Sequence, residues 1–384
     1  MRHYRRFAPA LNLAAEAYGR AVTSYEGFDD ENRALGPALA DELGRVLGAR
    51  STLDHFRYIQ SFEARFAAWC GRRHGVGLGS CTDALELTLA ALGVGPGDEV
   101  ITSAHTFIAT GLAIHHAGAT PVLVDPEPGD LCLSAAAVER ALTPRTMAIL
   151  PVHMHGHVGE IERILEIGQA AGVPVVEDCA QATGARLHGR RAPFGTIGCF
   201  SFYPSKPLGG IGNGGMLVTD DDALAERVRT LRDPDGGDPA LLRAGRTPSF
   251  LHPVDVAVLT LRLDQQDERQ RQRAARAAHY SRALAHLDPL VPRAGLDSAW
   301  GAFVLRSPDR DRIRRRLLTA GFETKVEYAT PWFESPTVAG QTWARGDWPV
   351  ARRAAAEGLS LPLRPTLSID QCARIARIVA EGSG

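Results

Sequence analysis

Residues 198–215 read GCFSFYPSKPLGGIGNGG, and this stretch decides how the rest of the chain is interpreted. Its first part is a short apolar run that predicts a buried strand, and the turn that follows contains Lys206. Glycines then recur through residues 209–215, where they let other groups approach the backbone closely. A lysine in such a place is a candidate for a Schiff base with an aldehyde, because burial favours the neutral, nucleophilic amine. A surface lysine in a flexible loop is the alternative.

Similar apolar runs recur on the N-terminal side of this stretch and directly after it, and together they predict an α/β fold. Gly, Pro or Asp bounds each run, and helical patterns separate most of them. Because helical crossovers connect parallel strands, we expect a mostly parallel sheet flanked by helices. The runs are GVGLG (75–79), EVITS (99–103), TPVLVD (120–125), MAILPVHM (147–154), VPVVEDCA (173–180), GCFSFYP (198–204) and GGMLVTD (214–220).

Along its length the chain divides into three predicted parts. These are an N-terminal helical segment over residues 1–55, a large α/β domain over 56–260, and a long helix with a small α+β domain over 261–384. Helical patterns cover residues 221–232 and 254–287. The stretch between these two patterns is rich in Pro, Gly and Asp, which predicts a loop.

The small-residue turn GSCTD at residues 79–83 directly precedes a predicted helix. Backbone N–H groups and hydroxyls at a helix N-terminus form a natural phosphate site. The alternative is a plain cap of the helix by Ser80 or Thr82. Because ligands of open α/β sheets collect at the carboxyl ends of the strands, we expect this turn and Lys206 at one edge of the sheet.

Two acids, Glu177 and Asp178, end the apolar strand within VVEDCAQ at residues 175–181. A buried carboxylate is costly unless it is paired or functional, and one that faces a protonated heterocycle nitrogen meets that requirement. A helix cap by Asp178 is the alternative. A phosphate site, an acid for a ring nitrogen and a lysine for an aldehyde together describe pyridoxal phosphate.

In these segments the chain resembles the DegT/DnrJ/EryC1/StrS aminotransferases, which use pyridoxal phosphate to aminate keto sugars of nucleotide sugars and keto cyclitols. The resemblance is dense over residues 60–230 and thin beyond them. It implies the aspartate aminotransferase-like fold of type I, with a large α/β domain and a smaller C-terminal one. It also implies a homodimer with shared active sites. The matching stretches are SCTDALELTLAALGVGPGDEVI, HTFIATGLAIHHAGATPVLVD, LTPRTMAILPVHMHG, VEDCAQATGA, CFSFYPSKPLGGIGNGGMLVTDD and GLSLPLRP.

The resemblance also implies a role for each matching residue. Lys206 would form the Schiff base with the cofactor and shuttle a proton between the substrate carbon and the cofactor. Asp178 would keep the pyridine nitrogen protonated, Gln181 would lie beside the phenolic oxygen, and Phe107 would stack on the ring face. The implied phosphate ligands are Ser80, Cys81, Thr82 and Ser201.

On the substrate side the resemblance implies glutamate or glutamine as amino donor and a keto group of a sugar nucleotide, cyclitol or related intermediate as acceptor. Family members usually carry a Gly-x-Asn-x-Arg-type segment before the long helix. Here residues 245–253 read GRTPSFLHP, in which the Asn is missing and Phe250 stands near the Arg position. The later PWFESP also lacks the usual histidine. The candidate substrate contacts are His105, His153, Arg246 and Tyr328.

These departures keep two further hypotheses open. The first is a lyase, a dehydratase or another non-transaminating pyridoxal phosphate enzyme on the same scaffold. Dehydratases related to the family replace the lysine with histidine, whereas this chain retains Lys206. The second is a non-catalytic binding module, against which the intact set of cofactor residues argues.

Composition narrows the class of protein. With 43 basic and 44 acidic residues the net charge is -1, which shows no electrostatic footprint of a nucleic-acid binder. No apolar stretch approaches the roughly 18 residues that span a bilayer, and the N-terminus lacks the pattern of a secretory signal. The six cysteines lie far apart without metal-ligand spacing, so we expect reduced thiols, no metal site and a cytoplasmic protein.

Overall fold

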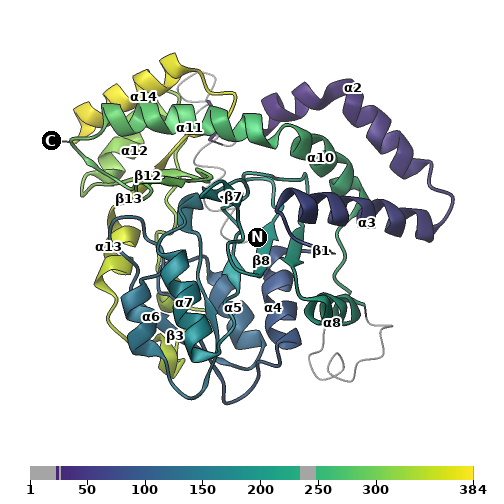
Figure 1. Cartoon of the computed structure of the whole chain (residues 1–384). Helices are drawn as coiled ribbons and strands as arrows, with labels where there is room; N and C mark the ends of the chain where they lie inside the picture. The colour runs from purple at the N-terminus through teal and green to yellow at the C-terminus, as the bar shows by residue number, and fades with distance from the viewer. Residues whose placement is uncertain (1–22, 26, 234–247, 384) are drawn as a thin grey trace.

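The computed structural model describes residues 23–25, 27–233 and 248–383. Figure 1 shows a large α/β part and a smaller C-terminal unit, with helices α10 (Pro253–Asp264) and α11 (Gln266–Ala283) running along one side of both. Helix α10 packs on the N-terminal helix α2 (Phe28–Leu47), and α11 packs on the last helix, α14 (Ile369–Gly382).

The central sheet of the large part has the strand order β1-β9-β8-β5-β4-β2-β3. Two parallel bridges, Ile149 with Val175 and Val152 with Asp178, join its two halves. Strand β9 is antiparallel to β1 and β8, and the other neighbouring pairs are parallel. The predicted α/β fold with a mostly parallel sheet is therefore confirmed. The strands are β1 (His74–Leu78), β2 (Glu99–Ser103), β3 (Thr120–Val124), β4 (Thr146–Leu150), β5 (Glu177–Asp178), β8 (Ile197–Ser201) and β9 (Gly215–Thr219).

Helices cover both faces of this sheet because successive strand residues point to opposite sides. Ile101 and Ile149 pack in one buried cluster with residues of α3, α6 and α7, whereas Val100 and Leu150 pack in another with residues of α4, α5 and α8. The helices are α3 (Thr52–Trp69), α4 (Cys81–Ala91), α5 (Ile108–His116), α6 (Ala135–Ala141), α7 (Ile161–Ala171) and α8 (Asp222–Arg232).

The C-terminal unit is an antiparallel sheet, β10-β12-β13, that shares a core with α11, α12 and α14. A second small sheet has the order β11-β6-β7, in which β11 pairs with β6. Among the described helices, none combines the length and apolar character needed to cross a bilayer. The remaining elements of the described residues are β6 (Arg186–Leu187), β7 (Arg190–Arg191), β10 (Asp288–Pro289), β11 (Leu296–Asp297), β12 (Phe303–Arg306), α12 (Arg310–Thr319), α13 (Pro349–Glu357), β13 (Gly358–Leu361) and the short 3-10 helices Met154–Gly156, Trp332–Glu334 and Thr342–Ala344.

The long helix predicted over residues 254–287 is two helices in the structure. The backbone N–H of Gln265 donates to Arg262, three residues back, and the next helix begins at Gln266. Both sequences are strongly helical, so periodicity alone could not reveal the break. Helix α10 spans residues 260 and 261, where the sequence placed a domain boundary, and the three-part division stays a prediction.

Because β9 alone runs against the other strands of the central sheet, its first residue lies at the same edge as their carboxyl ends. Gly215 pairs with Leu78 of β1 and with Ser201 of β8. The turn after β1, the acid at the end of β5 and the turn after β8 therefore meet at one edge. This edge is where ligands of open α/β sheets bind.

Candidate active site

A cavity of about 550 Å3 opens at this edge of the sheet. All eight residues that the sequence nominated for the cofactor line it, although they come from distant parts of the chain. His105 and His153 do not line this cavity, and Arg246 lies outside the described residues. The nominated residues that line it are Ser80, Cys81, Thr82, Phe107, Asp178, Gln181, Ser201, Lys206 and Tyr328.

The turn before α4 acts both as a helix cap and as a wall of the cavity. The Ser80 hydroxyl accepts a hydrogen bond of 3.1 Å from the Asp83 N–H, so the capping alternative is correct for this side chain. The Cys81 thiol donates to the Cys199 carbonyl at 3.6 Å, away from the cavity, and burial raises its pKa well above the usual range. The backbone of Cys81 and Thr82, at the positive end of α4, therefore faces an anion better than the thiol does.

Gly215 lets β9 pass directly beneath this turn. A Cβ on Gly215 would lie 2.3 Å from the carbonyl carbon and oxygen of Ser80 and 2.5 Å from the nitrogen of Cys81. Backbone atoms cannot give way as a flexible side chain can. The absence of a Cβ at Gly215 therefore lets the turn lie close to the end of β8, where Ser201 pairs with Gly215.

Asp178 ends β5 and is buried, with 5% of its surface exposed. Its Oδ1 accepts from the Ala180 N–H at 3.0 Å, and its Oδ2 accepts from the Thr110 hydroxyl at 2.9 Å. Burial raises the pKa of this carboxyl, while these two donors and the charge of Lys206 act in the opposite direction. A carboxylate that burial destabilises, yet that faces a cavity, is suited to pair with a cationic group of a ligand. Thr110 was not predicted from the sequence.

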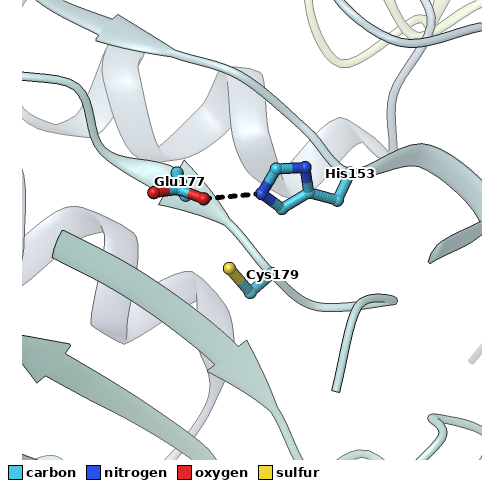
Figure 2. A group of neighbouring side chains, drawn as sticks. All are labelled: His153, Glu177 and Cys179. Atoms are coloured by element: carbon cyan, nitrogen blue, oxygen red, sulfur yellow. Dashed lines mark hydrogen bonds and ion pairs between the residues drawn. The ribbon is translucent and has the colours of Figure 1, made fainter. Parts of the chain in front are cut away.

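On the other face of β5, Glu177 holds the strand in place. Figure 2 shows His153 and Cys179 beside it, and His153 Nε2 bonds with Glu177 Oε2 at 2.8 Å. The Glu177 oxygens also accept from the N–H groups of Phe194, at 3.0 Å, and Gly195, at 2.6 Å. His153, predicted as a substrate contact, is 1% exposed and belongs to this network.

The same three side chains are of metal-ligand type, and their ligand atoms lie within 4.8 Å of one another. The carboxylate oxygens of Glu177, however, already accept three hydrogen bonds. Burial also raises the pKa of the Cys179 thiol well above its usual range, whereas a metal needs the thiolate. We interpret the cluster as structural support for Asp178, which stands between two of its members in the chain.

Lys206 lies on a loop whose backbone forms hydrogen bonds with buried charged side chains of α10. Its own N–H donates to the Tyr203 carbonyl at 2.9 Å. Asp255 of α10 accepts from the N–H groups of Ile211, at 2.8 Å, and Gly212, at 2.7 Å. Arg262, two helical turns further along, donates to the carbonyls of Gly209 and Gly210.

These supporting residues were missed because residues 254–287 were interpreted only as a helical pattern, with no role for its charged side chains. Asp255 and Arg262 are seven residues apart, so they share a face of α10, and both are buried. Two opposite charges at that spacing on an apolar helix face were the available signal.

Gln181, Tyr328 and Phe107 form another part of the cavity wall. The Gln181 amide donates to the Tyr328 hydroxyl at 3.3 Å, and its oxygen accepts from the His155 N–H at 2.6 Å. The Phe107 and Tyr328 rings lie 5.6 Å apart, and burial raises the pKa of Tyr328 well above its usual range. His105 packs behind this wall, 6.2 Å from the Tyr328 ring, and burial lowers its pKa to about 4.

The segment that departs from the family pattern is tied to the phosphate turn. The Ser249 hydroxyl accepts from the Gly79 N–H at 2.9 Å and donates to Asp83 at 2.8 Å. Phe250 packs against Phe56, with ring centres 5.5 Å apart. Phe250 therefore contributes no polar group to the cavity, and the position that usually supplies an arginine does not do so in this chain.

Comparison with known proteins agrees with this geometry. Residues 38–380 match the model of the DegT/DnrJ/EryC1/StrS aminotransferase family. The chain is 43% identical to the erythromycin biosynthesis sensory transduction protein EryC1 of Saccharopolyspora erythraea, over 88% of this chain and 93% of that protein. It is 42% identical to a dTDP-3-amino-3,4,6-trideoxy-alpha-D-glucose transaminase of Streptomyces venezuelae, over 86% and 89%. The crystal structure of S. venezuelae DesV covers 94% of this chain and 98% of its own, with a TM-score of 0.88 and 38% identity.

Proposed function

The chain belongs to the DegT/DnrJ/EryC1/StrS aminotransferase family, and from that premise we propose that it moves an amino group from glutamate or glutamine to a keto group of a nucleotide-linked sugar. It is a pyridoxal phosphate-dependent aminotransferase of fold type I, and the comparisons favour this activity over the lyase alternative. The observation that carries the proposal is the convergence of Lys206 and Asp178 on one cavity with a phosphate-type turn. The sugar acceptor is proposed because the S. venezuelae relative is a dTDP-sugar transaminase.

The cavity fits pyridoxal phosphate. The N-terminus of α4 with Thr82 and Ser201 would hold the phosphate, and Asp178 would pair with the ring nitrogen. Gln181 and Phe107 would hold the phenolic oxygen and one face of the ring. When bound, the cofactor supplies an electron-accepting ring and an aldehyde that takes up and releases the amino group.

The residues of this chain then have separate tasks. Asp178 keeps a proton on the nitrogen that it faces, because the buried carboxylate is stabilised by a cation beside it. The amine of Lys206 attaches the cofactor and moves a proton at the substrate carbon. Tyr328 stays protonated, so its hydroxyl can donate into the cavity while it accepts from Gln181.

We also propose that the enzyme works as a homodimer with shared active sites. Large apolar side chains at or beside the cavity are exposed, at 53% for Phe107, 42% for Tyr203 and 50% for Ile211. A second subunit would cover such a patch. The six free cysteines support a reducing, cytoplasmic setting for the enzyme.

Addition of an amino donor to the purified holoenzyme tests the activity directly. L-glutamate or L-glutamine is expected to convert the visible absorbance of the aldehyde form of the cofactor into the near-ultraviolet absorbance of its amine form. Stopped-flow spectroscopy would follow this half-reaction without any acceptor. A spectrum that stays unchanged with every amino acid donor would contradict transamination.

Gly215→Ala is expected to weaken cofactor binding, because the added Cβ collides with the backbone of Ser80. Overpacking of this kind costs about 1–3 kcal/mol, which corresponds to roughly 5- to 150-fold in the dissociation constant. Titration of the apoenzyme with pyridoxal phosphate measures this dissociation constant. Gly44→Ala is the matched control, since a Cβ there meets nothing within 4 Å. Equal affinity in both variants would mean that the turn does not hold the phosphate.

A further inference from the structure

A second, smaller cavity adjoins the first, and Ser205 and Lys206 line both. It encloses about 40 Å3, which suits one small polar group rather than a sugar ring. The ionisable residues in its described lining are Tyr25, Lys206, Arg273 and Arg364. Three of these four side chains are cationic, so this cavity has the charge of an anion site.

Separate elements bring the two guanidinium groups to this cavity. Arg273 lies on α11, is 6% exposed, and donates to the Pro207 carbonyl at 2.9 Å, next to Lys206. Arg364 follows β13 and is 9% exposed. Neither side chain is a solvated surface arginine, and burial strengthens the attraction of both for an anion.

The N-terminal segment lies against Arg364. A Cβ on Gly27 would lie 1.9 Å from its Nη1, and the φ of +64° at Gly27 is one that glycine adopts without strain. Tyr25 approaches the same cavity and is tied down by its N–H, which donates to Glu323 at 3.0 Å. Tyr25 therefore lines this cavity, and Gly27 lies against Arg364 beside it.

The chemistry of an amino donor places a carboxylate beside Lys206. The donor nitrogen has to reach the point where the Lys206 amine attaches the cofactor, and in an α-amino acid the carboxylate is bonded to the carbon that bears this nitrogen. The carboxylate must therefore lie within a few bond lengths of that point. The small cavity satisfies this requirement, and Gly301 of its lining packs against Gln181 of the cofactor cavity, since a Cβ there would lie 2.9 Å from the Gln181 carbonyl.

We infer that Arg364, with Arg273 beside it, binds the α-carboxylate of the amino donor. The inference deepens the proposed function and rests on it. It also accounts for the missing arginine of the segment before α10, where Phe250 packs against Phe56 instead. A guanidinium binds a carboxylate through two parallel hydrogen bonds, which orients the donor as well as holding it.

Calorimetric titration with L-2-hydroxyglutarate tests the site, because this probe keeps the α-carboxylate and replaces the reactive amine with a hydroxyl. The holoenzyme is expected to bind it, and Arg364→Met to bind it roughly 100-fold more weakly, as for loss of one partner of a buried charge pair. Arg364→Lys keeps the charge without the fork, and roughly 10-fold weaker binding is expected. Arg227→Met is the control, since Arg227 is exposed on α8 and lines neither cavity.

Stopped-flow measurements separate a role in donor binding from a role in folding. In Arg364→Met the half-reaction with L-glutamate is expected to slow about 100-fold at low donor concentration, whereas that with 4-aminobutyrate, which lacks an α-carboxylate, stays within about 3-fold of the wild type. The melting temperature reports any damage to the fold. The inference is overturned if the wild type does not bind L-2-hydroxyglutarate, or if Arg364→Met binds it as tightly as the wild type. It is also overturned if the substitution slows the half-reactions with L-glutamate and with 4-aminobutyrate by the same factor. Failure of the wild type to react with any donor would instead remove the proposed function.

Discussion

Replacement of Lys206 by alanine is expected to abolish amino transfer, with turnover falling on the order of 10⁴-fold or more. The amine supplies both the covalent attachment of the cofactor and the proton transfer, and no neighbour can replace it. The chain contains only two lysines, Lys206 and Lys325, so the experiment has few confounding side chains. Steady-state turnover with saturating donor and acceptor measures the loss.

Borohydride reduction followed by peptide mass spectrometry gives a second measurement of the same prediction. A pyridoxyl group is expected on Lys206 in the wild type and on neither lysine in Lys206→Ala. Lys325→Ala is the matched control, because the Lys325 ammonium lies 5.0 Å from the Tyr25 ring and lines neither cavity. If the wild type were labelled at Lys325, the assignment of the attachment point would be wrong.

The strands and the main cofactor residues could be predicted because both leave local signals. Seven apolar runs predicted the strands of the central sheet. Asp178 lies at the end of one of these strands, and the turn at 79–83 and Lys206 each follow another. The expectation that ligands gather at the carboxyl ends of strands then placed these residues together. What local patterns could not give was the reversed direction of β9, since an antiparallel strand buried on both faces has the same composition as a parallel one.

The supporting residues were not predictable in the same way, because their partners are far away in the chain. Thr110 reaches Asp178 across 68 positions, and Arg273 reaches Pro207 across 66. His153 shows the opposite case. It follows a strand at the correct edge of the sheet, but Glu177, which occupies the other face of β5, removes it from the cavity. The sequence predicted which residues lie at the ligand-binding edge of the sheet, but not the face of the sheet to which each side chain points.

Replacement of Asp178 by asparagine is expected to reduce turnover on the order of 10³-fold, because a neutral amide cannot hold a proton on the nitrogen that it faces. Asn has nearly the same shape, so the cavity is retained. Its oxygen can still accept from the Ala180 N–H, and its amide can donate to the Thr110 hydroxyl, which then donates to Thr106. Asp130→Asn is the matched control. Asp130 is also a buried carboxyl whose pKa burial raises, but it pairs with Arg293 outside the cavity. Turnover should change little in that variant.

The stability of the apoenzyme separates a functional acid from a structural one. Because burial raises the pKa of Asp178 above its unfolded value, the charged carboxylate destabilises the folded apoenzyme, and this cost grows as pH rises from the unfolded pKa through the folded one. At neutral pH, Asp178→Asn removes that cost, so the melting temperature of the apoenzyme is expected to rise or stay level while turnover falls. In Asp130→Asn, the loss of the hydrogen bond from Arg293 should lower the melting temperature of the apoenzyme. A variant at position 178 that loses both stability and turnover would indicate that Asp178 holds the fold rather than the cofactor.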